Sequence, residues 1–311
     1  MMPTHGTDEV LTEVTQGVGR IRLNRPAAIN ALTLGMIEAL LAALTDWAGD
    51  ARVERVELTG AGERGLCAGA DVRVLREQVL TGSGDPMRFF ATEYRLNALV
   101  DGYPKPYRAL MSGIVMGGGL GLSAHGSQRV VDASSRLAMP ETGIGLFPDV
   151  GISFLLGRAP GELGTYLALT GATVDGRLGV TAGLADGPFE PAPVPGWITE
   201  CFAGDDPAAI VARLEGDWDD PSPGECAAVL RTRSPWSVCV SLAAIRRAAA
   251  MGSVAEVLAQ DLVLAERLVR HPDFAEGVRA QLVDKDRRPR WTYPRIDQVP
   301  PDVVRAAFSP A

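Results

Sequence analysis

The sequence predicts an α/β protein in which helices pack outside a sheet, followed by a helical C-terminal region. Short strand patterns alternate with helical patterns up to about residue 186, as expected when helices cover a sheet. Two proline-rich segments, GPFEPAPVPG and DDPSPGE, then interrupt the chain, and a strongly helical pattern follows Ser237. We therefore expect a core over residues 1–200 and a helical region over residues 201–311.

The first expected elements are a hairpin, a helix and a strand. VLTEVTQ and VGRIRLN alternate apolar and polar residues around a Thr-Gln-Gly turn, which is typical of an antiparallel hairpin. The next segment, LGMIEALLAALTDWAG, has apolar residues at helical spacing, and Thr33 is its expected N-cap. VERVELTG then has the composition of a short strand.

A similar order of elements is expected from residue 106 onward. PYRALMSGIV is predicted to form one strand, and GGLGLSAHG to begin a helix. SQRVVDASSRLAMP should contain two extended pieces, and ISFLLGRAPGELGTYLALTG should be helical with a break at Pro-Gly. This alternation of strands and helices predicts the α/β core.

The composition excludes several classes of protein. The chain has 311 residues, of which 46% are hydrophobic and 22% charged, as in ordinary globular proteins. Its net charge of −8 argues against nucleic acids and anionic membranes as partners, because both attract dense positive charge. The four cysteines form no CxxC pair, so no zinc site or redox dithiol is expected. The polar, acidic start has no signal-peptide pattern, and we expect a cytoplasmic location.

One stretch is long enough to suggest a membrane span. Residues 109–128, ALMSGIVMGGGLGLSAHGSQ, contain no Asp, Glu, Lys or Arg. However, six glycines and several polar side chains lower the hydrophobicity of this stretch, and the chain has no second candidate. We therefore do not expect a transmembrane helix.

Two glycine-rich segments, GLCAGAD and MGGGLG, are candidates for ligand binding. Glycines allow backbone N–H groups to approach a ligand without obstruction by side chains. In one interpretation Gly119, Gly121 and Ala124 match the dinucleotide pattern G-x-G-x-x-A, with Glu141 further along the chain. In the other, one N–H from each segment binds the same carbonyl oxygen, as in an oxyanion hole.

Three acidic residues are candidates for acid–base chemistry. Glu141 and Asp149 lie among apolar residues, glycines and prolines in MPETGIGLFPDVG, where burial would raise a carboxyl pKa. The alternative is that Glu141 is a solvated turn residue and Asp149 a helix N-cap. Glu93, in a helical pattern, would alone be interpreted as a surface residue. For His125 we expect a structural role rather than a place in a pocket.

Several motifs together resemble the crotonase (enoyl-CoA hydratase/isomerase) superfamily, in the same order along nearly the whole chain. They are LNRPAAINAL, LCAGADVRVL, GIVMGGGLGLSAHGSQRVV and MPETGIGLFPDVG. ELGTYLALTG and HPDFAEGVRAQLVDKDRRPRW are similar to the 3-hydroxyisobutyryl-CoA hydrolase branch. The resemblance implies a spiral of β-β-α units with two roughly perpendicular sheets and a helical C-terminal region. It implies an acyl-CoA thioester as the ligand, no metal, no separate cofactor, and allows a trimeric or hexameric homo-oligomer.

The resemblance also implies roles for individual residues. The N–H groups of Ala70 and Gly118 match the pair that holds the thioester oxygen. Glu141 and Asp149 match the catalytic acids of the hydrolase branch, and Glu93 matches a further substrate-binding acid. Gly118, Glu141 and Asp149 are substrate-binding positions as well. Ala70 is itself a departure, because the hydrolases usually have glycine there.

A second departure bears on the reaction. Hydratases of the superfamily use two glutamates, and the first falls at Gly121 here, which has no carboxylate. Because addition of water to a double bond uses two positioned carboxylates, this favours thioester hydrolysis. The expected reaction is hydrolysis of a short β-hydroxyacyl-CoA, such as 3-hydroxyisobutyryl-CoA in valine breakdown. The alternatives are an enoyl-CoA hydratase or isomerase, a non-catalytic acyl-CoA-binding subunit, and an oxidoreductase.

Overall fold

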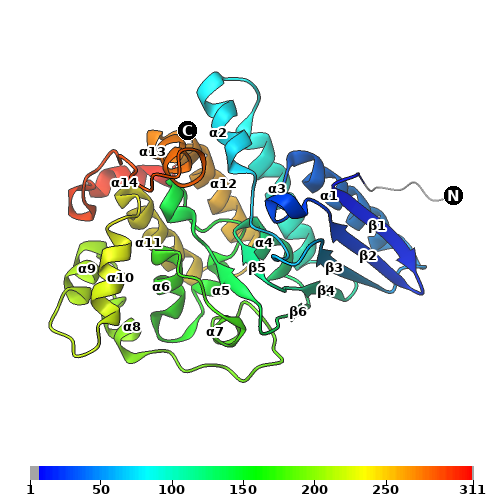
Figure 1. Ribbon diagram of the computed structural model, residues 1–311, viewed down its shortest axis with the longest axis horizontal. Helices are drawn as coiled ribbons and strands as arrows, with labels where there is room; N and C mark the ends of the chain where they lie inside the picture. The colour runs from blue at the N-terminus through cyan, green and yellow to red at the C-terminus, as the bar shows by residue number, and fades with distance from the viewer. Residues whose placement is uncertain (1–6, 310–311) are drawn as a thin grey trace.

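The strands of the computed structural model, which describes residues 7–309, form two sheets (Figure 1). The larger sheet has the order β1-β2-β3-β4-β6; only the β1–β2 pair is antiparallel. The smaller sheet pairs β5 with β7 in parallel. The bounds are β1 Val10–Thr15, β2 Val18–Leu23, β3 Arg55–Gly60, β4 Tyr107–Leu110, β5 Ile114–Met116, β6 Gln128–Val130 and β7 Arg136–Ala138.

The helices fall into two groups along the chain, one interspersed with the strands and following them up to residue 190, and one after it. The first group is α1 Leu34–Gly49, α2 Val72–Thr81, α3 Pro86–Asp101, α4 Gly118–Ser123, α5 Ser153–Leu156, α6 Leu163–Thr170 and α7 Gly176–Thr181. The second is α8 Gly196–Cys201, α9 Pro207–Leu214, α10 Ser222–Leu230, α11 Pro235–Ala249, α12 Val254–Arg270, α13 Pro272–Val278 and α14 Pro301–Ala307. Short helical turns include η2 Glu141–Ile144 and η5 Ile296–Gln298. In Figure 1 the β1–β2 hairpin and helices α9 and α10 lie at opposite ends of the molecule.

The predicted hairpin and first helix are confirmed. Gln16 and Gly17 have φ values of 53° and 77°, the positive pair that a tight hairpin turn requires. The side chain of Thr33 caps α1 by accepting a hydrogen bond from Met36 N at 3.2 Å. Local sequence patterns were sufficient here because each signal lies within a few residues of its effect.

The prediction of a single strand over PYRALMSGIV is wrong. The chain changes sheets within this segment, from β4 to β5, through Gly113 at φ +60°. A Cβ atom at Gly113 would lie 2.6 Å from Arg64 O, so only glycine fits between the two segments. The uncharged stretch around it is divided among β4, β5 and α4. Within residues 7–309, none of the helices has the length and apolar character needed to cross a bilayer.

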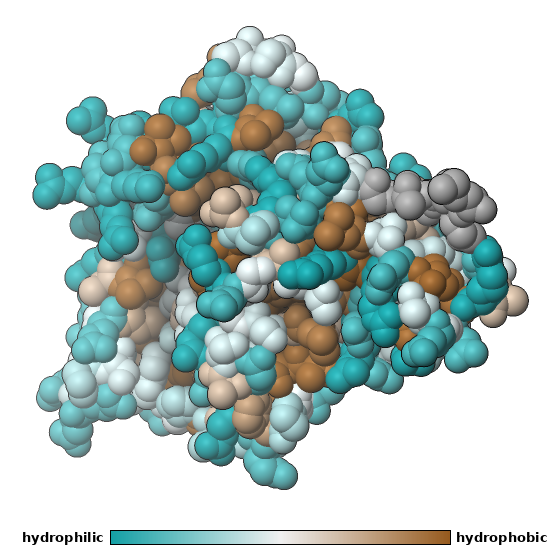
Figure 2. Space-filling view, turned by 45° about the vertical axis from the view of Figure 1, so that its right-hand side comes forward, coloured by the Kyte–Doolittle hydropathy of each residue, from teal (hydrophilic) through white to brown (hydrophobic). Residues whose placement is uncertain are grey.

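One hydrophobic core extends through both halves of the chain. Its buried side chains run from Val10 on β1 to Ala307 on α14. Helix α12 packs against α3, and α11 packs against α5 and α6. On the face shown in Figure 2, apolar patches are separated by polar side chains. The division into a core over 1–200 and a helical region over 201–311 stays a prediction.

Candidate active site

The register of neighbouring extended segments brings the two glycine-rich segments together. Cys67 and Val115 form a parallel bridge, and Met116 N donates to Cys67 O at 2.9 Å. Ala70 and Gly118 each follow the bridged residues by three positions. A Cβ atom built on Gly69 would lie 3.5 Å from Gly118 N. The two segments therefore run side by side, as an oxyanion hole between them requires.

The N–H groups of Ala70 and Gly118 are free to bind a ligand. Gly118 is the first residue of α4, so its N–H has no acceptor inside the helix. Within residues 7–309, neither of these N–H groups donates a hydrogen bond to another protein group. Their pairing in an oxyanion hole stays a prediction. The structure shows only that the two segments lie close together.

The glycines that suggested dinucleotide binding serve close packing instead. A Cβ atom on Gly121 would lie 2.7 Å from Val150 Cβ and 2.8 Å from Asn97 Nδ2. A Cβ atom on Gly119 would lie 2.5 Å from Cys67 O. Every residue of α4 is buried, so its glycines allow protein groups, rather than phosphates, to approach the helix. This packing removes the reason for the dinucleotide interpretation.

Glu141 is buried beside the glycine-rich segment that leads into α4. It opens η2 shortly after β7, and its side chain is only 7% exposed. A Cβ atom on Gly117 would lie 2.7 Å from Glu141 Oε1, so glycine at 117 leaves room for this carboxylate. Among the described residues 7–309, Oε2 has no hydrogen-bond partner. The interpretation of Glu141 as a solvated turn residue is therefore wrong.

Glu93 is buried beside the next residue of the same segment, Gly118. It lies on α3 and is 1% exposed, and its Oε1 occupies the space that a Cβ atom on Gly118 would need. Within residues 7–309 this oxygen has no hydrogen-bond partner. The interpretation of Glu93 as a surface residue is wrong. A sequence signal existed, because Glu93 shares the buried helix face of Phe89, Phe90, Leu96, Asn97 and Val100.

Asp149 does not cap a helix. Its carboxylate is 7% exposed and accepts a hydrogen bond from the Tyr94 hydroxyl at 2.8 Å. The next helix, α5, begins at Ser153, and Ile152 occupies its N-cap position. Helix α3 therefore carries one acid of the candidate site, Glu93, and binds a second, Asp149, through Tyr94.

Burial determines the protonation of these three acids. It raises the pKa of Glu93 and Glu141 well above the ordinary range, and the charge of Asp149 raises both further. Burial also raises the pKa of Asp149 to about 6, although the hydrogen bond from Tyr94 opposes this shift. The cluster therefore retains protons near neutral pH, and it can both donate and accept protons in a reaction.

Four residues near the acids were not predicted as site residues. Tyr94 and Asn97 lie on the same face of α3 as Glu93. Both amide atoms of Asn97 lack hydrogen-bond partners in the part of the chain that the structure describes. His125 and Asp261 contact the segment after Asp149. The helical periodicity of α3 could have indicated the first pair. Asp261 had no local signal, because it lies more than a hundred residues from its contact.

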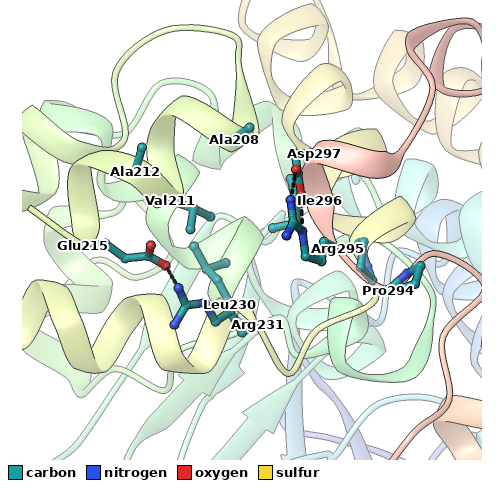
Figure 3. A pocket seen from close by; sticks show the side chains of 11 residues that line it. Ala208, Val211, Ala212, Glu215, Leu230, Arg231, Pro294, Arg295, Ile296 and Asp297 are labelled. Carbon is teal, nitrogen blue, oxygen red and sulfur yellow. Dashed lines mark hydrogen bonds and ion pairs between the residues drawn. The ribbon is translucent and has the colours of Figure 1, made fainter.

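A cavity of about 510 Å³ lies apart from this cluster, between α9, α10 and residues 294–297 (Figure 3). Val211, Leu230 and Ile296 are among the apolar side chains that line it. Two ion pairs, Arg231–Glu215 and Arg295–Asp297, line the cavity, so each of these arginines already has an acidic partner. None of the predicted site residues lines this cavity.

Comparison with known proteins identifies the family of the chain. The model of the enoyl-CoA hydratase/isomerase family matches residues 18–195 and 187–308. The chain belongs to this family. The predicted α/β fold with a helical C-terminal region, which the resemblance implied, is the crotonase fold of this family.

Two relatives within the family are named as hydrolases. The chain is 36% identical to the mitochondrial 3-hydroxyisobutyryl-CoA hydrolase of Danio rerio over 99% of this chain and 91% of that protein. It is 35% identical to the human enzyme of the same name, over 95% and 87%.

Two similar solved structures are titled differently. A carnitinyl-CoA dehydratase from Mycobacterium thermoresistibile has a TM-score of 0.93 and 41% identity, covering 98% of this chain and 97% of that chain. An enoyl-CoA hydratase from Rhodobacter sphaeroides has a TM-score of 0.91 and 37% identity, covering 97% of each. The choice between hydrolysis and hydration therefore depends on the site itself.

Proposed function

We propose that this protein hydrolyses the thioester of a short β-hydroxyacyl-CoA, such as 3-hydroxyisobutyryl-CoA, to the free acid and coenzyme A. This proposal rests mainly on one observation: residue 121 is glycine and provides no carboxylate. Val150 and Asn97 fill the space beside Gly121, where a hydratase of the superfamily would place its first glutamate. Three other acids lie nearby. Glu141 lies beside Gly117 and Glu93 beside Gly118, and the charge of Asp149 raises the pKa of both glutamates.

The first step is binding of the thioester carbonyl. Its oxygen would accept hydrogen bonds from the N–H groups of Ala70 and Gly118, which lie on adjacent segments. Negative charge develops on this oxygen as the carbon becomes tetrahedral. Loss of one such donor typically raises the barrier by about 2.7–4 kcal/mol.

Glu141 would then act by one of two routes. As a general base it takes a proton from water, the resulting hydroxide attacks the thioester carbon, and the C–S bond breaks as the thiolate leaves. As a nucleophile it attacks the carbon directly, expels the thiolate and forms an anhydride, which water then hydrolyses to regenerate Glu141. In both routes the thiolate takes up a proton and leaves as the coenzyme A thiol.

Asp149 and Glu93 would bind the hydroxyl group of the substrate and help to position Glu141. Both are buried, and a protonated carboxyl can donate a hydrogen bond while an ionised one can only accept. Within residues 7–309, Oε1 of Glu93 has no hydrogen-bond partner. The hydroxyl group of the substrate would supply this partner. These contacts would favour a hydroxylated acyl group over a plain one.

A second candidate function is hydration of an enoyl-CoA, or the reverse dehydration. Glu93 and Glu141 each have a buried oxygen without a hydrogen-bond partner, so a pair of acids is present despite Gly121. The titles of the two similar structures name a dehydratase and a hydratase. An isomerase needs only one base, and Glu141 would serve.

A product assay on the purified protein separates these functions. The protein is incubated with 3-hydroxyisobutyryl-CoA, isobutyryl-CoA and crotonyl-CoA, while free thiol and enoyl absorbance are both recorded. Hydrolysis releases thiol, whereas hydration removes enoyl absorbance without releasing thiol. We expect thiol release, fastest from the hydroxylated substrate. Binding without either change would indicate a non-catalytic acyl-CoA-binding protein and contradict the proposal.

The setting of this reaction is also a proposal. With 3-hydroxyisobutyryl-CoA as substrate, the reaction belongs to valine breakdown. The four cysteines, which are buried and unpaired with one another, support a reducing compartment. We propose the cytoplasm; the vertebrate relatives are named as mitochondrial enzymes. A trimeric or hexameric assembly would be recognised by light scattering coupled to size-exclusion chromatography.

A further inference from the structure

The backbone directly after Asp149 has an unusual conformation. Val150 and Gly151 have φ values of +54° and +74°, both in the left-handed region. A β-branched residue such as valine rarely adopts this region, so its surroundings must impose the conformation. The side chain of Val150 is fully buried, with its Cβ packed beside Gly121.

One edge of the peptide group between Val150 and Gly151 is held by His125. Nε2 of this histidine lies 2.8 Å from Val150 O. A carbonyl oxygen only accepts hydrogen bonds, so Nε2 carries the hydrogen and donates it. The imidazole is 9% exposed, and burial lowers its pKa, which favours the neutral ring. His125 comes from the chain just after α4.

The other edge of the same peptide group is held by Asp261, which comes from α12. Its Oδ2 accepts the hydrogen bond of Gly151 N at 2.8 Å. The side chain is fully buried, and Oδ1 has no hydrogen-bond partner among the residues that the structure describes. Burying a carboxyl group is costly, so a fixed role in the molecule is needed to account for it.

We infer that His125 and Asp261 are positioning residues that clamp the Val150–Gly151 peptide and thereby fix Asp149 in the acid cluster. The C=O and N–H of a trans peptide point in opposite directions, so the two side chains hold the peptide plane from both sides. The Tyr94 hydroxyl holds the carboxylate of Asp149 at the same time. This inference rests on the proposed function, in which Asp149 binds the substrate hydroxyl.

The clamp assigns a role in the site to the C-terminal helical region. Asp261 lies on α12, and α12 packs along α3, which carries Glu93 and Tyr94. Two helices distant in sequence therefore set the position of Asp149. Helix α12 holds the backbone that follows Asp149, and α3 holds the Asp149 side chain. A displacement of about 1 Å in such a group can lower a rate about 100-fold.

Two substitutions of Asp261 and one control variant test the clamp. Asp261→Leu removes the acceptor for Gly151 N, whereas Asp261→Asn keeps an oxygen that can accept the same hydrogen bond. Gln260→Leu is the matched control, because Gln260 is a buried polar neighbour on α12 whose contacts are with Arg247 and Ala244 on α11. Melting temperature, kcat and KM for the hydroxyacyl-CoA, and hydrogen exchange of the segment containing Gly151 are measured for each.

We expect Asp261→Leu to lower kcat about 10-fold to 100-fold with a smaller change in KM, and to accelerate exchange at Gly151. Asp261→Asn should restore most of kcat and the slow exchange, and Gln260→Leu should affect at most the melting temperature. Equal losses in kcat for the Leu and Asn variants would overturn the acceptor role. So would a wild-type kcat and unchanged exchange in a folded Asp261→Leu protein.

A second variant covers the case in which Asp261→Leu does not fold. His125→Leu removes the donor to Val150 O from a different part of the chain and should produce the same fall in kcat and faster exchange. Unchanged kcat and exchange in this variant would also contradict the clamp. The exchange measurement does not depend on turnover, so it tests the clamp even if the wild-type protein releases no thiol and the proposed function fails.

Discussion

At the scale of single residues, the environment of Glu141 is the main support for its proposed role in thioester chemistry. Its carboxylate is buried, one oxygen has no protein partner, and burial raises its pKa well above the ordinary range. A carboxylate in this state is a stronger base than one in water. The sequence segment around it suggested burial, but the contact with Gly117 became visible only in the structure.

Glu141→Gln should therefore abolish most of the activity while leaving acyl-CoA binding nearly unchanged. The substitution keeps the shape of the side chain but removes the base or nucleophile, which contributes about 100-fold to 10,000-fold. Turnover and binding are measured by thiol release and calorimetry. Glu13→Gln, at an exposed glutamate on β1, is the control and should behave like the wild type. More than about a tenth of wild-type turnover in Glu141→Gln would show that another residue has this role.

Asp149 should make the stability of the protein depend on pH. Its pKa in the folded protein is about 6, above its ordinary value of 3.8, so folding penalises the ionised form. The folded state thus loses stability as pH rises from about 4 through 6, by up to about 3 kcal/mol. Asp149→Asn has no ionised form and should be more stable than the wild type at pH 7.5. Its advantage should vanish at pH 4, as measured by thermal unfolding at both values.

The same variant should lose activity selectively. Asparagine can still accept the hydrogen bond from Tyr94, but it cannot provide charge or a titratable proton. We expect Asp149→Asn to lower kcat substantially for a β-hydroxyacyl-CoA and less for an acyl-CoA without the hydroxyl, because that hydrogen bond is then absent already. Equal losses on the two substrates would instead assign Asp149 to the orientation of Glu141 or of water.

At the scale of elements, the contact between α3 and α4 depends on glycine. Gly121 faces Val150 and Asn97 at distances that leave no room for a side chain. We expect Gly121→Ala to cost about 1–3 kcal/mol of stability through overpacking, and Gly121→Glu to cost more without creating hydratase activity. Gly224→Ala on α10 is the control, since a Cβ atom there meets nothing within 4 Å, and it should not destabilise the protein. Equal melting temperatures for Gly121→Ala and the wild type would contradict this packing.

Elements were predictable where their signals are local. The hairpin of β1 and β2 follows from alternation and a glycine turn, and the start of α1 follows from Thr33. The change of sheet between β4 and β5 was missed, because both strands carry the same apolar pattern and only the packing at Gly113 separates them. The helical pattern alone placed Glu93 at the surface, because a charged residue within such a pattern usually faces solvent; only the family resemblance assigned it to the site.

At the scale of the whole molecule, both halves of the chain complete one core and one site. Residues after 200 contribute α11 and α12 to the core, and Asp261 to the turn after Asp149. We therefore expect a fragment of residues 1–200 to expose apolar surface and to lack cooperative thermal unfolding and thiol release. Circular dichroism and the thiol assay would show this; a stable, active fragment would contradict the dependence on the helical region. Contacts of this range were beyond local sequence patterns, although the family resemblance implied the fold.

The most direct test of the central claim is the ratio of two rates on the wild-type protein. The kcat/KM for thiol release from 3-hydroxyisobutyryl-CoA is compared with the kcat/KM for hydration of crotonyl-CoA, under identical conditions. A site with Glu141 beside the thioester and no carboxylate at Gly121 predicts a ratio far above one. Rapid hydration of crotonyl-CoA without thiol release from the hydroxyacyl substrate would contradict the hydrolase assignment.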